Sequence, residues 1–220
     1  MRWSVPAAAA VMVAGLLWLY RGPGPDQPTP PAGERPWEVQ VLADGTSRVF
    51  GLIPGRSTLA DAMGRFGKGL EAAMFESPGR PLTLEACYSE VVVGGITGRL
   101  ILSLAPSPAV LQGLRERSPG AKRLGTGAIR YPIDFRDAEV LPSLTVRGLT
   151  LVPSANLDEA TVQARFGDPV ERVPAGEGAS RWLYPDRGVA VTISEQGKDL
   201  IDYAAPSDFA WLREVYATPE

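Results

Sequence analysis

The strongest constraint in this sequence is the apolar segment, residues 3–20 (WSVPAAAAVMVAGLLWLY), which has 18 residues and no charged side chain. As an α-helix it would reach about 27 Å, close to the ~30 Å hydrocarbon core of a bilayer. Trp3, Trp18 and Tyr20 stand at its ends, where aromatic rings favour the membrane interface. We therefore predict a transmembrane anchor at residues 1–20.

The flanking charges predict the orientation of this anchor. Arg2 and the terminal amine precede the segment, which favours an N-terminus in the cytoplasm. The expected location is the bacterial inner membrane, with a single pass and the C-terminal domain in the periplasm. The alternative is secretion after signal cleavage, although Arg21 follows the segment where a small-x-small cleavage site would be expected.

A proline-rich stretch follows at residues 21–36 (RGPGPDQPTPPAGERP). Six prolines in 16 residues are incompatible with a helix or a sheet. We expect an extended linker that holds the remaining chain away from the bilayer.

Two segments of the remaining chain share one layout, residues 49–67 and residues 146–167. Each begins with a short strand carrying Gly-Leu, continues through a proline turn, and ends a short helix with Arg-Phe-Gly. Ser57 and Asn156 are the expected N-caps of these helices. The repetition predicts two units, residues 37–142 and residues 143–220.

Periodicity and turn residues place the other elements. Strands are expected at 82–89, 91–93, 100–104, 180–184, 189–194 and 200–203, and helices at 108–117 and 207–216. Residues 118–142 are expected to form a glycine-rich stretch and a linker. The predicted fold class is α+β: an N-terminal transmembrane helix, then two tandem units of short helices packed on an antiparallel sheet.

The second unit carries a resemblance to a known family. Arg165-Phe-Gly167-Asp-Pro169 ends its helix, Trp182-Leu-Tyr184 follows on a strand, and a hairpin ends at Tyr203. This order resembles the SmpA/OmlA (BamE-like) envelope domain over residues 146–203 and, more weakly, residues 49–104. In tandem it resembles the beta-lactamase inhibitor protein fold. The resemblance implies helices on an antiparallel sheet and a function in protein binding, without chemistry.

The amino-acid composition excludes several kinds of catalytic and metal-binding site. The chain has no histidine and one cysteine, Cys87, which excludes Ser-His-Asp catalysis, His-ligated metals and an internal disulfide. A net charge of −3 gives no reason to expect nucleic-acid binding. We predict no enzyme activity, no metal, no cofactor and no small-molecule substrate. The pairs Asp134 with Asp137 and Asp199 with Asp202 leave a carboxylate-dependent cell-wall enzyme as an alternative.

Two groups of side chains are candidates for binding a partner. The aromatic group is expected in the core under the C-terminal helix, or as hot spots if it is exposed. The basic group is expected as a solvated helix end, or as a contact for an acidic partner or lipid headgroup. The candidates are Trp182, Tyr184, Tyr203 and Trp211, with Arg115, Arg117 and Arg123.

The resulting functional hypothesis is a membrane-anchored interaction module of the cell envelope. It would serve as an adaptor or accessory subunit, with a protein partner in the inner membrane or envelope and a membrane contact through residues 3–20. The alternatives are a proteinaceous inhibitor or regulator of a secreted hydrolase, and the carboxylate-dependent enzyme.

Overall fold

A single antiparallel sheet organises this protein. The computed structural model describes residues 35–216, and its ten-stranded sheet has the order β6-β7-β3-β4-β5-β8-β12-β11-β10-β9. The strands are β3 (Glu71–Glu76), β4 (Thr83–Val93), β5 (Ile96–Leu104), β6 (Lys122–Arg123), β7 (Ile129–Pro132), β8 (Val146–Pro153), β9 (Glu171–Pro174), β10 (Ala179–Tyr184), β11 (Val189–Ser194) and β12 (Leu200–Ala204). A separate two-stranded ribbon pairs β1 (Gln40–Val41) with β2 (Ser47–Arg48).

The continuity of this sheet shows that the predicted fold class is wrong. Strand β8 pairs with β5 on one side, where Ile101 opposes Thr150, and with β12 on the other, where Thr150 opposes Asp202. Both edges of β8 are thereby hydrogen-bonded, which removes the exposed strand edge that two separate sheets would leave. The molecule is one large sheet with short helices rather than two tandem α+β units.

The predicted transmembrane helix lies outside the described residues. Within residues 35–216, no helix has the length and apolar character needed to cross a membrane. The described helices are α2 (Leu59–Phe66), α3 (Pro108–Glu116), α4 (Glu159–Phe166) and α5 (Phe209–Tyr216). The four helical positions expected from the sequence are therefore confirmed, with ends that differ by a few residues.

The N-caps of the two repeated helices differ from the expected ones. The Thr58 side chain accepts from the backbone N–H of Asp61, and Asp61 in turn accepts from the backbone of Thr58, which completes a capping box. The Asp158 carboxylate caps α4 by accepting from the backbone N–H of Thr161. Each cap therefore lies one or two residues beyond Ser57 or Asn156, because the chain stays extended up to Thr58 and Asp158.

The repeated layout corresponds to a repeated contact. The Tyr88 hydroxyl donates to the carbonyl oxygen of Gly67 at 2.9 Å, after α2, and the Tyr184 hydroxyl donates to that of Gly167 at 3.1 Å, after α4. The preceding Phe66 packs against Tyr88 with ring centroids 5.6 Å apart. Phe166 packs against Tyr184 in the same way at 5.8 Å. In both halves a tyrosine on the sheet therefore fixes the end of a helix.

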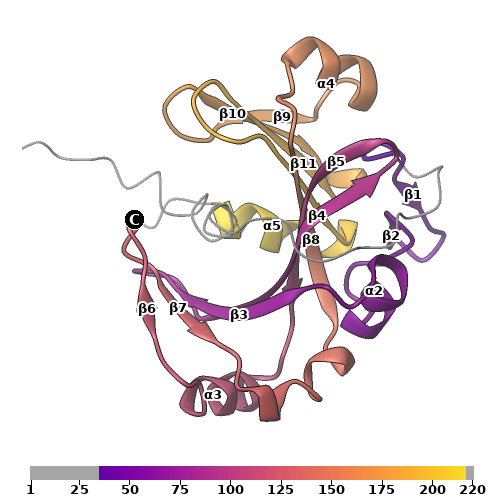
Figure 1. The fold of residues 1–220 in the computed structure, drawn as a ribbon. Helices are drawn as coiled ribbons and strands as arrows, with labels where there is room; N and C mark the ends of the chain where they lie inside the picture. Colours follow the sequence, from indigo (N-terminus) through magenta and orange to yellow (C-terminus); the bar gives the residue numbers. More distant parts are fainter. Residues whose placement is uncertain (1–34, 217–220) are drawn as a thin grey trace, which may run out of the picture.

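The two faces of the sheet are covered by different helices. Figure 1 shows the sheet curving, with α5 inside the curve and α2, α3 and α4 outside it. On the outer face, buried side chains of these three helices join the large core around Tyr88, Trp182 and Tyr203. On the inner face, Phe209 and Leu212 of α5 pack in a smaller, separate cluster. The inner face is thus covered over one part by α5.

Six strands were not expected from the sequence: β1, β2, β3, β6, β7 and β9. The short strand expected at residues 49–52 is instead a tight turn, in which Val49 and Leu52 pair with each other. The sequence of β3, EAAMFE, has small residues and no clear alternation, and β6, β7 and β9 have only two to four residues each. Such short or irregular runs give little period-two signal, so their pairing partners determine their structure.

Candidate interaction site

The aromatic candidates belong mainly to the core. Trp182, Tyr184 and Tyr203 are each at most 3% exposed. Trp211 is partly exposed and lies under the guanidinium of Arg147, 4.5 Å from its ring centroid. The buried Trp182, Tyr184 and Tyr203 hold helices and strands together, so these three side chains offer no surface to a partner in this structure.

The start of the described chain is tied to this core. The Tyr203 hydroxyl donates to the carbonyl oxygen of Pro36 at 2.9 Å. Trp37 packs edge-on against Phe166, with centroids 6.5 Å apart, and the guanidinium of Arg165 covers Trp37 at 4.8 Å. The end of the predicted linker is therefore anchored beside α4 and β12.

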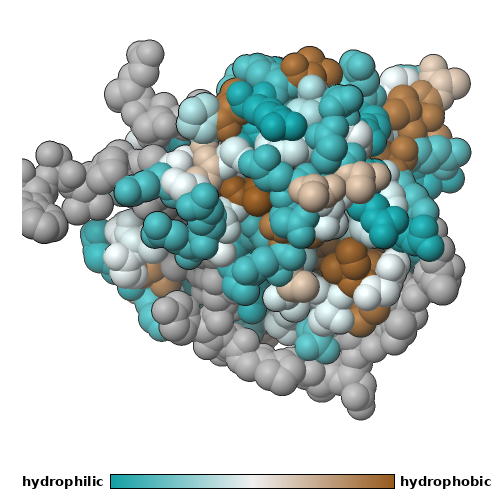
Figure 2. All heavy atoms as spheres, turned by 90° about the horizontal axis from the view of Figure 1, so that it is seen from above, coloured by the Kyte–Doolittle hydropathy of each residue, from teal (hydrophilic) through white to brown (hydrophobic). Residues whose placement is uncertain are grey.

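One face of the molecule has no broad apolar surface. Figure 2 shows that the coloured residues of this face are mostly hydrophilic, with hydrophobic side chains in small, separate groups. A contact made there would depend on a few side chains. The large hydrophobic residues that remain exposed among the described residues are Val41, Phe135, Val140 and Val170.

The basic candidates all lie on the surface, and two of them form ion pairs. Arg115 donates to Glu76 at 2.9 Å, and the Tyr131 hydroxyl donates to the same carboxylate at 2.7 Å. The hydrogen bond from Tyr131, followed by that from Arg115, lowers the pKa of Glu76. Arg117 pairs with Asp137, and Arg123 is exposed on the edge strand β6. The three arginines thus occupy one end of the sheet without forming a single cluster of unpaired charge.

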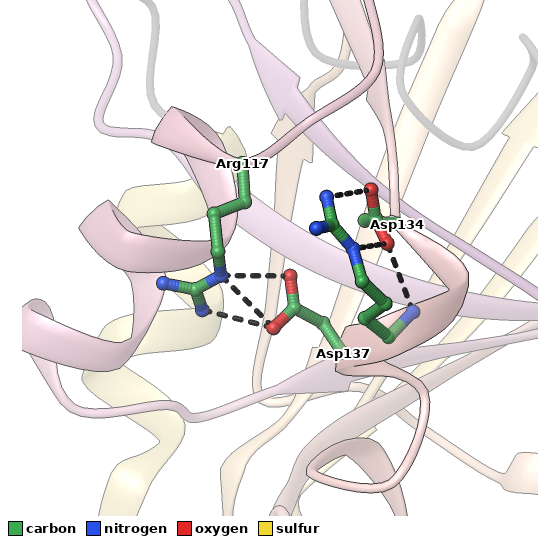
Figure 3. A network of polar contacts seen from close by, with 4 residues as sticks. Arg117, Asp134 and Asp137 are labelled. Atoms are coloured by element: carbon green, nitrogen blue, oxygen red, sulfur yellow. Dashed lines mark hydrogen bonds and ion pairs between the residues drawn. The ribbon is translucent and has the colours of Figure 1, made fainter.

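The Phe135 loop, residues 134–137, is the most distinctive surface feature near these arginines. The Asp134 carboxylate accepts two hydrogen bonds from the Arg136 side chain and one from its backbone N–H, each 2.9 Å long. The Asp137 carboxylate accepts two bonds of 3.0 Å from Nε of Arg117, which follows α3 (Figure 3). Both carboxylates are mostly buried, whereas Phe135 between them is 85% exposed. The polar network thereby holds an aromatic side chain out into solvent.

Sequence reasoning did not single out Phe135. It treated Asp134 and Asp137 as a carboxylate pair, but the structure gives each of them its own arginine. One local pattern could have predicted the turn. An aspartate often accepts from the backbone N–H two residues later, and here that residue is an arginine, as is typical of a short capped turn. Arg117, 20 residues earlier in the chain, had no such local signal.

The ion pair at Asp134 predicts how the loop responds to acid. The hydrogen bonds from the Arg136 side chain and backbone lower the pKa of Asp134 from 3.8 to about 2. A lowered pKa means that the carboxylate stabilises the fold above its ordinary pKa and loses this effect only as the pH falls through about 2. We expect an NMR titration of Asp134 to have its midpoint near pH 2, and the Arg136→Gln variant to titrate at higher pH. An unshifted midpoint in the unchanged protein would contradict this network.

The other predicted carboxylate pair also has structural partners. The Asp199 carboxylate accepts from the backbone N–H of Ser194 at 2.9 Å and of Leu157 at 2.5 Å, which joins the β11–β12 turn to the segment before α4. Asp202 is fully buried and pairs with Arg181 at 3.0 Å. These acids therefore fix segments of the fold to one another.

Among residues 35–216, no group of three or more His, Cys, Asp or Glu side chains is placed to bind a metal ion. Cys87 is buried on the inner face, and desolvation raises the pKa of its thiol. This placement is that of an unreactive apolar side chain.

Comparison with protein-family models, with curated proteins and with solved structures finds no match to this chain. The resemblance to the SmpA/OmlA (BamE-like) domain therefore stays a prediction.

Proposed function

We propose that this protein is a membrane-anchored interaction module of the cell envelope, an adaptor or accessory subunit without catalytic activity. The observation that carries this proposal is the exposed Phe135, held between two carboxylates that are each paired with an arginine. A protein partner in the inner membrane or envelope would receive this side chain in an apolar pocket.

The physical case rests on what a fixed aromatic side chain can contribute to binding. Burying a phenylalanine side chain stabilises a complex by about 1.5–3 kcal/mol. The bonds that hold residues 134–137 are already formed in the free protein, so little backbone freedom is lost on binding. Arg136 is exposed beside the ring, and aromatic and arginine side chains are the residues enriched in binding hot spots.

The membrane part of the proposal rests on the sequence of residues 3–20. The proposed location is a single pass in the bacterial inner membrane with residues 35–216 in the periplasm, or a secreted form if the segment is cleaved. The proline-rich linker would let the Phe135 loop reach a partner at a distance from the bilayer.

The alternative functions receive no comparable support from the described residues. The hydrolase-inhibitor hypothesis depended on exposed aromatic side chains, and Trp182, Tyr184 and Tyr203 are buried. The carboxylate-dependent enzyme depended on two facing acids, and Asp134, Asp137, Asp199 and Asp202 each have a partner within the fold.

The test compares two exposed apolar residues at different places. The full chain is extracted in mild detergent, and the proteins that co-purify are measured by mass spectrometry. Phe135→Ser should reduce recovery of the partner by 10-fold or more, since a hot spot contributes about 2 kcal/mol or more. The control is Val170→Ser, which removes a side chain that is 69% exposed next to α4 and should leave recovery unchanged.

Two results would overturn the proposal. One is a monodisperse, partner-free protein after gentle extraction of the unchanged chain. The other is equal partner recovery with Phe135→Ser and with Val170→Ser. Thermal unfolding of both variants serves as the control for folding, because substitutions at exposed sites are expected to change stability by less than about 0.5 kcal/mol.

A further inference from the structure

A second apolar surface lies on the inner face of the sheet, next to the part that α5 covers. We call it the inner stripe: Ala73, Phe75, Cys87, Ile101, Val152 and Leu200. The pairing register puts Cys87 opposite Ile101, with Val152 two residues further along β8 than the partner of Ile101. The stripe therefore runs diagonally across β3, β4, β5, β8 and β12.

The inner stripe is buried, but the described helices do not account for this. Each of its six side chains is at most 4% exposed. Among residues 35–216, the partly buried apolar side chain packed against it is Leu124, from the β6–β7 hairpin. The side chains of α5, Phe209 and Leu212, belong to the neighbouring cluster instead. Arg99, Glu85 and Glu71 act electrostatically on Cys87 and so border the inner stripe, while the apolar side chains themselves would face water if nothing covered them.

We propose that the apolar segment, residues 3–20, docks on the inner stripe when no bilayer is available to it. Its composition fits, because 18 residues without a charge would otherwise lie in water. Its dimensions fit as well. Five strands spaced ~4.8 Å apart span about 19 Å, and 18 residues of helix extend about 27 Å.

The connection between the segment and the sheet is long enough. Residues 21–34 separate the apolar segment from the first described residue, Arg35. In an extended proline-rich conformation these 14 residues reach about 43 Å. The described chain begins beside β12, where Pro36 accepts from Tyr203, and Leu200 of the inner stripe lies on the same strand. The linker therefore has only to pass the end of a strand, which is about 17 Å long for five residues.

Residues 3–20 would have two alternative locations, the inner stripe and the bilayer. The same residues cannot lie on the inner stripe and in a bilayer at once. Insertion would remove the cover and open the inner stripe, whereas docking would keep it closed in a protein outside the membrane. This inference shares the apolar segment with the proposed function, but it depends neither on insertion of that segment into a bilayer nor on the contact made by Phe135.

The single cysteine of the chain provides the probe. Cys87 lies within the inner stripe, and no other thiol competes with it. The experiment introduces a second cysteine into the full chain by Met12→Cys, Val13→Cys, Ala14→Cys or Gly15→Cys, four consecutive positions that sample all sides of a helix. Mild oxidation should join at least one of these positions to Cys87 within one molecule, detected by peptide mass analysis. Thr29→Cys in the linker is the matched control and should not form this bond.

A second measurement uses the natural thiol alone. Val13→Glu places a charge in the apolar segment and should raise the rate of maleimide labelling of Cys87 by at least 10-fold. Loss of the cover hydrates the thiol and lowers its pKa, and both changes increase reactivity. Thr29→Glu should leave the rate unchanged.

Three outcomes would overturn the docking proposal: no bond to Cys87 from any of the four positions, a bond only between two molecules, or equal labelling rates for Val13→Glu and Thr29→Glu. Vesicles of phosphatidylglycerol and phosphatidylethanolamine separate this failure from failure of the anchor. If the bond forms on oxidation in buffer but does not form on oxidation in the presence of vesicles, docking and anchoring both stand. If it forms equally well with vesicles present during oxidation, docking stands and the anchor fails.

Discussion

The Asp202→Asn variant is expected to lower the free energy of unfolding by about 3–5 kcal/mol, since breaking a buried ion pair leaves the remaining charge uncompensated. Asp202 is fully buried, and its carboxylate lies 3.0 Å from Nη2 of Arg181, whose side chain is 4% exposed. Asparagine keeps the size of the side chain and can still accept the 2.6 Å hydrogen bond from Thr150. The substitution therefore isolates the loss of the negative charge.

The measurement is urea-induced unfolding, with thermal unfolding as a second readout. The midpoint temperature should fall by an amount on the order of 10 °C for a chain of this size. The control Glu159→Gln changes an exposed pair with Arg172 at 3.9 Å and should cost less than about 1 kcal/mol. A double variant, Arg181→Met with Asp202→Leu, should lose less stability than Asp202→Asn, because it removes both charges of this pair. Wild-type stability of Asp202→Asn would contradict the buried pair.

The second large effect is expected at Gly188, which follows the turn after β10. Its φ is +68°, and a Cβ atom there would lie 2.0 Å from the carbonyl oxygen of Ala204. The close approach has a structural cause, because the backbone N–H of Ala204 donates to the carbonyl of Gly188 at 2.9 Å. Gly188→Ala should cost about 2–5 kcal/mol from the left-handed backbone and the collision together.

The matched control for this substitution is Gly45→Ala. Gly45 has a φ of +78° on an exposed turn, and no atom lies within 4 Å of the position of its Cβ. It should therefore cost only the backbone penalty, about 1–2 kcal/mol. The comparison is made by urea unfolding of the two variants, and equal losses would show that the collision with Ala204 can be relieved by a small backbone shift.

Local signals predicted many of the elements. The four helices follow from apolar spacing, with polar caps at α2, α3 and α4 and terminal glycines at α2 and α4, and these signals act within one or two turns. The hairpin of β4 and β5 follows from alternation around a glycine-rich turn, and so does the β11–β12 pair. The caps themselves were displaced to Thr58 and Asp158, since the choice among neighbouring polar residues depends on where the chain leaves its extended conformation.

Pairing between distant strands was not predictable in the same way. The register of β5 with β8 joins residues about 50 positions apart, as at Ile101 and Thr150, and no local pattern encodes that partner. The repeated layout suggested two separate units, but it carried no information on whether their sheets would join. The buried pair of Arg181 and Asp202 has the same origin, because it arises only once β10, β11 and β12 lie side by side.

The candidate site shows the same division. The sequence marked Arg115, Arg117 and Arg123 as basic surface residues, and all three are exposed. It did not mark Phe135, because whether an aromatic side chain is buried or exposed depends on what packs above it.

By itself, the sequence determined the helices, the turns, the main hairpins and the absence of histidine chemistry, since these depend on residue identity and on neighbours within a few positions. Only the tertiary structure decided that the strands form one sheet, that Trp182, Tyr184 and Tyr203 are core residues, and that Phe135 points outward. The physical reason is that burial and charge pairing depend on which surfaces meet. Those surfaces come from parts of the chain that are far apart in sequence.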